Sequence, residues 1–203
     1  MTILTDNTNY KAIADAIRAK NGTEETYKPS EMASAISAIS GGDITAIKSL
    51  LEIDYDLLTE ITIPEGVTKL RNYCFNYYDE LETVNLPSTL KSIGSSAFSG
   101  CNKLKNIVLP DGLTDMYPRV FEDCYALESI TIPSGVKNLM EYTFGWCEAL
   151  TEVTFKGTPE SMSVNTFGNS TNLITINVPW AEGAVANAPW GAENATINYN
   201  FKG

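Results

Sequence analysis

Eight side chains in the middle of the chain carry the chemistry best suited to binding. They are aromatic or charged and recur in successive 23-residue segments: Tyr73, Tyr77, Tyr117, Arg119, Asp123, Tyr125, Tyr142 and Trp146. Tyrosine and tryptophan offer a large, rigid contact area, and their rings also stack on sugar faces. We expect these residues to form a partner-binding surface. The alternative is that the rings only cover the outer turns of the fold.

The sequence contains no constellation of residues typical of catalysis. Histidine is absent, which removes the commonest general base, the Ser-His and Cys-His nucleophile pairs and most zinc sites. The acid pairs Glu24–Glu25 and Asp54–Asp56 lack the glycine and glutamate that a calcium loop requires, so we expect a solvated surface there. We predict no enzyme activity and no catalytic, cofactor-binding or metal-binding residue. Carboxylate chemistry on the surface is the minor alternative.

The four cysteines are best explained as small core residues. Cys101, Cys124 and Cys147 follow one another at intervals of 23 residues, and Cys74 occupies another place in the repeat. Neighbouring units would bring such residues ~5 Å apart, which a disulfide accepts. Three in one row cannot all pair, however, and no Cys-x-x-Cys pattern indicates zinc. We therefore predict free thiols, as expected of a chain without a signal segment.

Composition and charge exclude several classes of partner. The chain has 203 residues, of which 43% are hydrophobic and 19% are charged, so it is neither a disordered nor a collagen-like polymer. Lys plus Arg is 14 and Asp plus Glu is 25, giving a net charge of −11. Phosphate backbones and anionic lipids repel such a chain, so nucleic acid and membrane are not expected as partners. We see no signal peptide and no transmembrane segment, which predicts synthesis in a cytoplasm.

An internal repeat of 23 residues must position the eight candidate residues. Leucine opens each unit, at Leu58, Leu81, Leu104, Leu127, Leu150 and Leu173. Phenylalanine recurs without exception at position 18 of the unit, at Phe75, Phe98, Phe121, Phe144 and Phe167. The alternation after the leucine predicts a strand that ends at a proline, then a second short extended piece. The segment around the phenylalanine is expected to form one helical or 3₁₀ turn.

Stacking of these units predicts a solenoid. A 23-residue unit cannot bury its apolar side alone, but stacking builds one continuous core in which like residues form ladders. Positions 16 and 20 flank the buried phenylalanine and are expected to face outward. Six of the eight candidate residues occupy these two positions, so the repeat predicts that they share one side of the solenoid.

The chain divides into four predicted segments. They are an N-terminal helical attachment region (1–42), a helical cap or linker (43–57), the solenoid (58–178) and a C-terminal cap with a terminal strand (179–203). Apolar residues at helical spacing indicate the helices of residues 1–57. In the C-terminal cap we expect Trp180 and Trp190 to plug the core, with carbohydrate stacking as the alternative. The predicted fold class is α+β: a short right-handed solenoid of about six repeats after a small helical region.

The repeat resembles the BspA-type leucine-rich repeats of bacterial, phage and protozoan proteins. The resemblance covers about residues 58–178 and rests on a strand followed by Pro-x-Gly-Val and by Phe-x-x-Cys-x-x-Leu. It implies a structural or adhesive protein with no catalytic residue. In addition, residues 10–22, 27–36 and 178–192 are similar to terminal segments of tail and other virion-associated proteins of phages and prophages of Gram-positive bacteria.

The resemblance at both ends implies a non-enzymatic protein located in the virion. In that reading the N-terminal helices bind virion components, and the solenoid binds a glycan or a protein on the host surface. The alternative is a cellular bacterial repeat module that binds another protein without a virion. In either reading we expect the N-terminal helices to dock on the open N-terminal end of the solenoid, on a second copy of the chain as a homo-oligomer, or on a larger particle.

Overall fold

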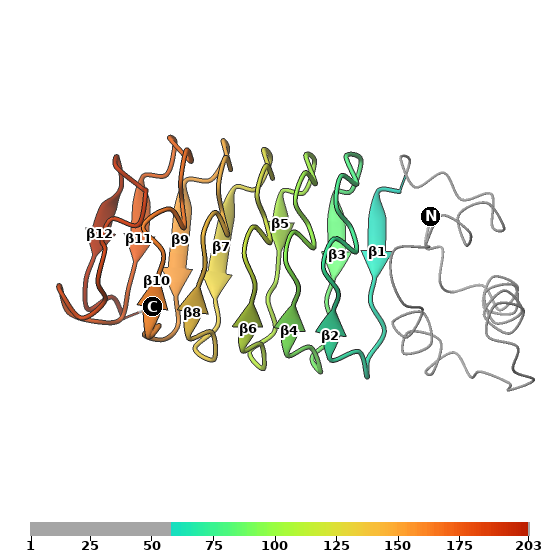
Figure 1. The fold of residues 1–203 in the computed structure, drawn as a ribbon, viewed down its shortest axis with the longest axis horizontal. Helices are drawn as coiled ribbons and strands as arrows, with labels where there is room; N and C mark the ends of the chain where they lie inside the picture. Colours follow the sequence, from blue (N-terminus) through green and yellow to red (C-terminus); the bar gives the residue numbers. More distant parts are fainter. Residues whose placement is uncertain (1–57, 203) are drawn as a thin grey trace, which may run out of the picture.

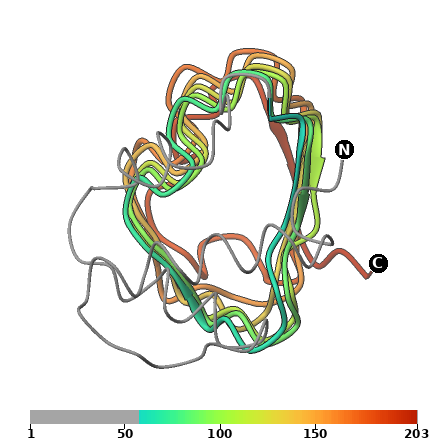
Figure 2. The same ribbon diagram turned by 90° about the vertical axis from the view of Figure 1, so that its right-hand side faces the viewer.

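The chain folds as a solenoid of stacked rungs (Figure 1). The computed structural model describes residues 58–202. Each 23-residue repeat forms one rung, from rung 1 (58–80) through rung 2 (81–103), rung 3 (104–126) and rung 4 (127–149) to rung 5 (150–172). A closing rung 6 comprises residues 173–202. Viewed end-on, the rungs superimpose as a ring, so equivalent residues of successive repeats follow one another in file (Figure 2).

The first strand of each rung and the terminal strand of rung 6 belong to one row of parallel strands. The row consists of β1 (Glu60–Thr62), β3 (Thr83–Asn85), β5 (Asn106–Ile107), β7 (Ser129–Ile132), β9 (Glu152–Phe155), β11 (Thr175–Asn177) and β12 (Thr196–Asn198). From β1 to β11, paired residues are 23 positions apart, as Ile61 and Val84 are. Apolar side chains of this row point inward, which confirms the alternation predicted from the sequence.

A second row of shorter parallel strands lies beside the first. It consists of β2 (Lys69–Leu70), β4 (Ser92–Ile93), β6 (Asp115–Met116), β8 (Asn138–Leu139) and β10 (Ser161–Met162). Its second residue is buried in every rung. This confirms the second extended piece expected in each repeat.

Both strand rows are interrupted at the same junction. Among the described residues, the first row divides into β1-β3-β5 and β7-β9-β11-β12, and the second divides into β2-β4-β6 and β8-β10. Strands β5 and β6 belong to rung 3, and β7 and β8 belong to rung 4. The junction between these two rungs therefore lacks a regular strand ladder in either row, and beside the first row the Glu128 N–H still donates to the Lys105 carbonyl across it at 3.0 Å.

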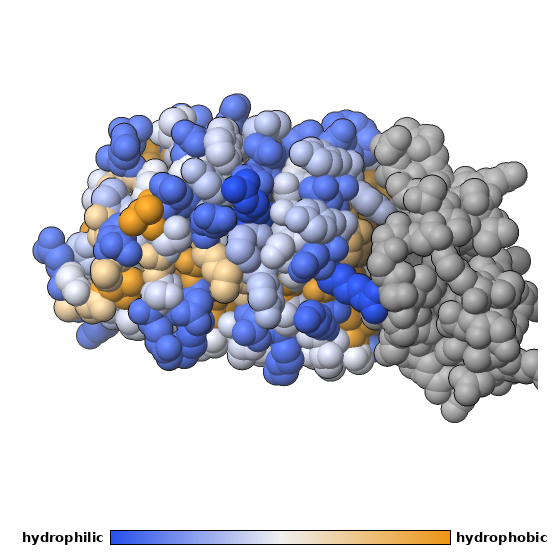
Figure 3. All heavy atoms as spheres, in the orientation of Figure 1, coloured by the Kyte–Doolittle hydropathy of each residue, from blue (hydrophilic) through white to orange (hydrophobic). Residues whose placement is uncertain are grey.

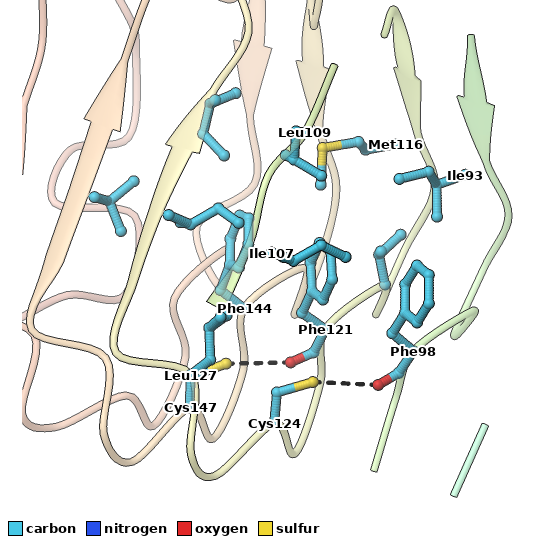
Figure 4. Packing of buried hydrophobic residues seen from close by; sticks show 14 of the residues in the cluster. Ile93, Phe98, Ile107, Leu109, Met116, Phe121, Cys124, Leu127, Phe144 and Cys147 are labelled. Carbon is cyan, nitrogen blue, oxygen red and sulfur yellow. Dashed lines mark hydrogen bonds between the residues drawn. The ribbon is translucent and has the colours of Figure 1, made fainter. Parts of the chain in front are cut away.

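A file of phenylalanine rings runs through the core on the third side of the solenoid (Figure 4). The rings of Phe75, Phe98, Phe121, Phe144 and Phe167 stack with centroid separations of 5.3, 5.6, 5.6 and 5.7 Å. Neighbouring ring planes are inclined by only 5–19°. Unlike the strand rows, this file crosses the junction between rungs 3 and 4 without a change in spacing.

A row of thiols tethers the same turns. Cys101, Cys124 and Cys147 lie 3.2, 3.2 and 3.1 Å from the phenylalanine carbonyl oxygen of the preceding rung, and Ser170 makes the same bond at 2.6 Å (Figure 4). The hydroxyl or thiol donates in each case. The four cysteines are free, which confirms the prediction of unpaired thiols in the core.

The C-terminal end of the solenoid is closed by two buried tryptophans. Trp180 is 5% exposed and packs edge-on against Phe155, and Trp190 is 1% exposed. The Trp190 carbonyl accepts a bond from the Phe167 N–H (2.9 Å) in place of a further rung. Burial of both rings confirms the predicted plug and excludes the carbohydrate-stacking alternative. Strand β12 pairs in parallel with β11 at this end of the solenoid.

The predicted α+β class is wrong for the described part of the chain. Residues 58–202 form an all-β solenoid without a helix. The helix or 3₁₀ turn expected around each phenylalanine is an extended series of turns, because every second N–H bonds to the next rung. The helices predicted within residues 1–57, and the acid pairs there, lie outside the described residues.

Candidate functional site

The turns that carry the phenylalanine share their backbone bonds between two rungs. At positions 16, 18 and 20 the N–H donates to a carbonyl of the following rung, as Phe98 N–H does to Val120 O (3.0 Å). The intervening N–H groups donate within the turn, as Cys101 N–H does to Phe98 O (3.2 Å). In a helix all these donors would point along one axis. The alternating pattern instead locks each turn to its neighbour.

Most residues at positions 16 and 20 adopt a left-handed backbone conformation. Positive φ values of 51–61° occur at Tyr73, Tyr77, Ser96, Arg119, Asp123, Tyr142 and Trp146. Gly100 has φ +76° and Asn169 has φ +63°, and these two residue types suit that conformation. Six of the eight predicted binding residues therefore have a backbone conformation that favours glycine or asparagine over larger residues. We call the outward side chains at positions 14 to 23 of rungs 1 to 4 the turn face.

Three of the predicted residues come together with Glu122 in one cluster, which we call the stacked cluster. The Arg119 guanidinium carbon lies 5.0 Å from the centroid of the Tyr142 ring, and that ring stacks on Trp146 at 5.0 Å and 27°. Arg119 also donates to the nearly buried carboxylate of Glu122 at 2.7 Å. This hydrogen bond is the main reason why the pKa of Arg119 is raised. The cluster spans rungs 3 and 4 and thus bridges the junction where both strand rows are interrupted.

Two glycines shape the floor beneath Tyr142. A Cβ atom at Gly145 would lie 3.0 Å from Tyr142 Cδ1, and one at Gly168 would lie 2.8 Å from Tyr142 Cε1. The ring therefore rests directly on the backbone of these two glycines. Tyr142 and Trp146 are half-buried as a result, so the cluster is ordered before any partner arrives.

A second group, which we call the open cluster, consists of Tyr77, Asp123, Tyr125 and Glu148. The Tyr125 hydroxyl lies 3.4 Å from Asp123 Oδ1. The Asp123 carboxylate raises the pKa of Tyr125, with smaller contributions from Glu148 and Tyr77. Tyr77 leans over rung 2, because a Cβ atom at Gly100 would lie 2.5 Å from Tyr77 Cδ1.

The two remaining predicted residues belong to neither cluster. Tyr73 is 62% exposed in rung 1, and Tyr117 is 39% exposed in rung 3. Sequence reasoning did not select Glu122, Glu148 or Gly100. The signal for Gly100 was its place at position 20, where all other rungs carry a side chain. Glu122 and Glu148 gave no signal, since an acidic residue in a turn normally indicates only a solvated surface.

The turn face is rich in carboxylates. Its ionisable acids and bases, apart from tyrosine and cysteine, are Arg71, Asp79, Glu80, Lys103, Arg119, Glu122, Asp123, Glu141 and Glu148. Within residues 58–202 no three Cys, Asp or Glu residues are placed to hold a metal ion. The same part of the chain has no helix of the length and apolarity that a membrane span requires. Hydrophobic side chains on the face seen in Figure 3 are scattered among hydrophilic ones.

Burial lowers the reactivity of the thiols. Loss of solvation raises the pKa of Cys74 and of Cys101 to about 12. It also raises the pKa of Cys124 and Cys147, which are fully buried. A thiol must lose its proton to act as a nucleophile or to bind a metal. We therefore expect none of these four side chains to react or to bind a metal in the folded chain.

Comparison with known proteins identifies the repeat and the fold. Residues 68–183 match the family described as BspA type leucine rich repeat region, in six copies. No curated protein matches the chain in sequence.

Three solved structures have a similar fold. A leucine-rich repeat protein from Bacteroides ovatus is 34% identical over 60% of this chain and 32% of its own, with a TM-score of 0.54. The T. pallidum leucine rich repeat protein is 25% identical over 70% of both chains, with a TM-score of 0.56. A leucine rich cell surface protein from Faecalibacterium prausnitzii is 26% identical over 72% of this chain and 36% of its own, with a TM-score of 0.57. The chain thus spans about a third of the Bacteroides ovatus and Faecalibacterium prausnitzii proteins.

Proposed function

The chain belongs to the BspA-type leucine-rich repeat family, and from that premise we propose that its turn face binds a protein partner. Proteins built from such repeats are typically binding modules without catalysis, in which the stacked core is a scaffold and the surface provides specificity. The eight residues selected from the sequence are the proposed contact surface. A bacterial module for protein–protein interaction is therefore the function favoured here.

The observation that carries this proposal is the presence of bulky side chains at left-handed positions. A residue other than glycine or asparagine in this conformation destabilises the fold by roughly 1–2 kcal/mol. Tyr73 and Tyr77 are more than 60% exposed, so burial of their rings does little to offset this destabilisation. A role in contact with another molecule explains why rings occupy these positions, since nothing in the core requires them.

The stacked cluster has the properties of an interface anchor. Tyrosine, tryptophan and arginine are the residues that most often dominate binding energy at protein interfaces. Here Arg119, Tyr142 and Trp146 are already held by one another and by Glu122, so little side-chain entropy is lost when a partner binds.

The virion role remains a prediction of the terminal segments. The N-terminal residues expected to contact virion components lie outside the described part of the chain. The three similar structures come from bacteria, and one is named a cell surface protein, which favours the bacterial binding module. Binding of a host glycan by the solenoid is the less favoured proposal, because the rings of Tyr142 and Trp146 already stack on each other.

Site-specific photo-cross-linking in the producing cell tests the proposal. A photoreactive phenylalanine analogue replaces Tyr77 on the turn face or, as the control, Val108, which directly follows β5 in the sequence and is 82% exposed. We expect a discrete protein adduct from Tyr77 and none from Val108. The adduct should be lost in a Tyr142→Ala/Trp146→Ala background that still unfolds cooperatively. Adducts from Val108 alone, or none from either site, would contradict the proposal.

A further inference from the structure

If the turn face binds a protein, as proposed above, the open cluster contacts a particular kind of side chain on that partner. We infer that Tyr77, Asp123, Tyr125 and Glu148 bind a lysine or arginine side chain, so that the partner is a protein segment with basic residues at the contact. The partner chemistry follows from the geometry of the rings, from the charges beside them and from a filled site of the same kind, the stacked cluster, on the same turn face.

The rings of the open cluster are exposed and held in place. Tyr77 is 64% exposed, yet one edge of its ring rests on the backbone of Gly100, where a Cβ atom would come within 2.9 Å of Tyr77 Cε1. Tyr125 is 43% exposed, and its hydroxyl is tied to Asp123 Oδ1 at 3.4 Å. Ala149, next to Glu148, donates its N–H to the Tyr125 carbonyl at 3.0 Å, and Gly100, beneath the Tyr77 ring, donates to the Glu122 carbonyl, next to Asp123, at 2.8 Å. The four residues therefore lie on adjacent turns.

The carboxylates of this cluster lack a cation from the described residues. The ion pairs within residues 58–202 are Lys103–Glu80, Arg119–Glu122 and Lys156–Asp111, and none of them involves Asp123 or Glu148. Two negative charges thus lie beside two exposed aromatic rings. A cation over a tyrosine ring gains about 0.5–1 kcal/mol at an exposed site, and adjacent carboxylates add a charge-assisted hydrogen bond.

The stacked cluster shows the same arrangement with the cation in place. There Arg119 lies over the Tyr142 ring at 5.0 Å and contacts the Glu122 carboxylate at 2.7 Å. The open cluster repeats the tyrosine and the carboxylate, but within the described residues no basic side chain completes it. A lysine or arginine from outside residues 58–202 would reproduce the contact that Arg119 makes with Tyr142 and Glu122 in the stacked cluster.

The net charge of the chain favours the same kind of partner. At −11 the chain attracts basic segments and repels phosphate and acidic ones. Long-range attraction alone, however, would act on any acidic surface of the molecule. The test must therefore separate binding at Tyr77 and Tyr125 from attraction by the charge as a whole.

The probe is an eight-residue peptide of alternating lysine and serine, compared with the same peptide acetylated on its lysines. Binding to the full chain is followed by the backbone amide signals in NMR titrations. We expect shifts at Gly100, Asp123 and Tyr125 with the lysine peptide only. Asp123→Asn/Glu148→Gln should weaken binding at least fivefold. Asparagine tolerates the left-handed conformation of Asp123, so this variant is expected to fold.

The control is Glu182→Gln/Glu193→Gln, which removes the same charge from the C-terminal cap, where both side chains are exposed. An equal loss of affinity in the two variants would overturn the inference, as would no binding at millimolar peptide or equal binding of the acetylated peptide. The photo-cross-linking experiment separates the two proposals. If Asp123→Asn/Glu148→Gln leaves the Tyr77 adduct unchanged, the basic partner is wrong but the turn face still binds a protein.

Discussion

The turn side and the strand side of this solenoid differ in continuity. The two strand rows are both interrupted between rungs 3 and 4, whereas the phenylalanine file keeps its 5.6 Å spacing across that junction. Backbone bonds of the turns also cross it, as Phe121 N–H to Thr143 O does at 2.9 Å. The side without regular strands therefore keeps its full set of contacts across the junction, whereas the strand side keeps the bond from Glu128 N–H to Lys105 O (3.0 Å) but no ladder.

This difference arises because the turn side has the same core residue in rungs 1 to 5, whereas the outer residues of the strand side vary. Every turn of rungs 1 to 5 has a phenylalanine at position 18, so rings of equal size stack at equal intervals. The outer positions of the strands vary, and the first strand of rung 3, β5, has only two residues, Asn106 and Ile107. Regular strand pairing persists between the other neighbouring rungs and is absent only between rungs 3 and 4. The turn side maintains the stack and also displays the proposed binding residues.

Removal of the central ring should have the largest effect on stability. Phe121→Ala is expected to lower the free energy of unfolding by about 3–5 kcal/mol, because it leaves a cavity in the file at the junction. Ile107→Ala, in the interrupted row, should cost about 2 kcal/mol, since β5 has no ladder on its rung-4 side and can relax. Urea denaturation followed by circular dichroism measures both.

Phe121→Leu serves as the second variant if the alanine chain does not fold. It keeps most of the volume and should cost less than Phe121→Ala, but its unfolding should still begin at rungs 3 and 4 in hydrogen exchange. A larger loss for Ile107→Ala than for Phe121→Ala would show that the strand rows, and not the turns, hold the junction together.

The repeat in the sequence was sufficient to predict the ladders of the fold. The period of 23, the constant leucine and phenylalanine and the alternation before the proline each specify a buried position. The interruption between rungs 3 and 4 could not be predicted, because the apolar residues of rung 3 keep their places and only the pairing geometry changes. For residues 58–202 the α+β class was wrong because the helical or 3₁₀ turn expected around each phenylalanine instead bonds alternately within its own rung and to the next rung.

The candidate site was predicted in part. Outward direction at positions 16 and 20 follows from their place beside the buried phenylalanine. Their left-handed backbone could not be read from Tyr77 or Trp146, since such residues rarely adopt it, although Gly100 and Asn169 at the same position indicate it. The contact of Arg119 with Tyr142 depends on the side-chain conformations of two residues 23 positions apart, which the neighbouring sequence does not specify.

Alkaline pH should lower the free energy of unfolding through the buried thiols of the turn side. An unfolded thiol loses its proton near pH 9, whereas burial raises the pKa of Cys101 to about 12 and also raises that of Cys124. The unfolded state therefore gains stability as the pH rises above 9, and the contribution of each thiol is fully present only below that pH. We expect a loss of about 1.4 kcal/mol per pH unit for each buried thiol between pH 9 and pH 11.

Serine substitution supplies the control for this titration. Ser170 already makes the bond of the cysteine ladder at 2.6 Å, so Cys101→Ser/Cys124→Ser/Cys147→Ser should keep the tether without an ionisable group. Its free energy of unfolding, measured in urea at pH 8 to 11, should fall less steeply than that of the parent chain. Equal slopes would show that the ladder thiols do not cause the alkaline loss. The strand rows bury no ionisable side chain within residues 58–202, so they cannot contribute.

The smallest effect is expected from the exposed ion pair that spans the junction. Lys156 in rung 5 contacts Asp111 in rung 3 at 2.7 Å, with side chains 52% and 82% exposed. Because water screens such charges, a double-mutant cycle of Lys156→Met and Asp111→Asn should give a coupling of only about 0–1 kcal/mol, lower still in 0.5 M salt. The matched cycle uses Lys103 and Glu80, which contact at 2.6 Å across rungs 1 and 2, where the strands are paired. If the turns alone bridge the junction, the two couplings should be similar. A clearly larger coupling for Lys156–Asp111 would mean that this long-range pair replaces the missing strand ladder.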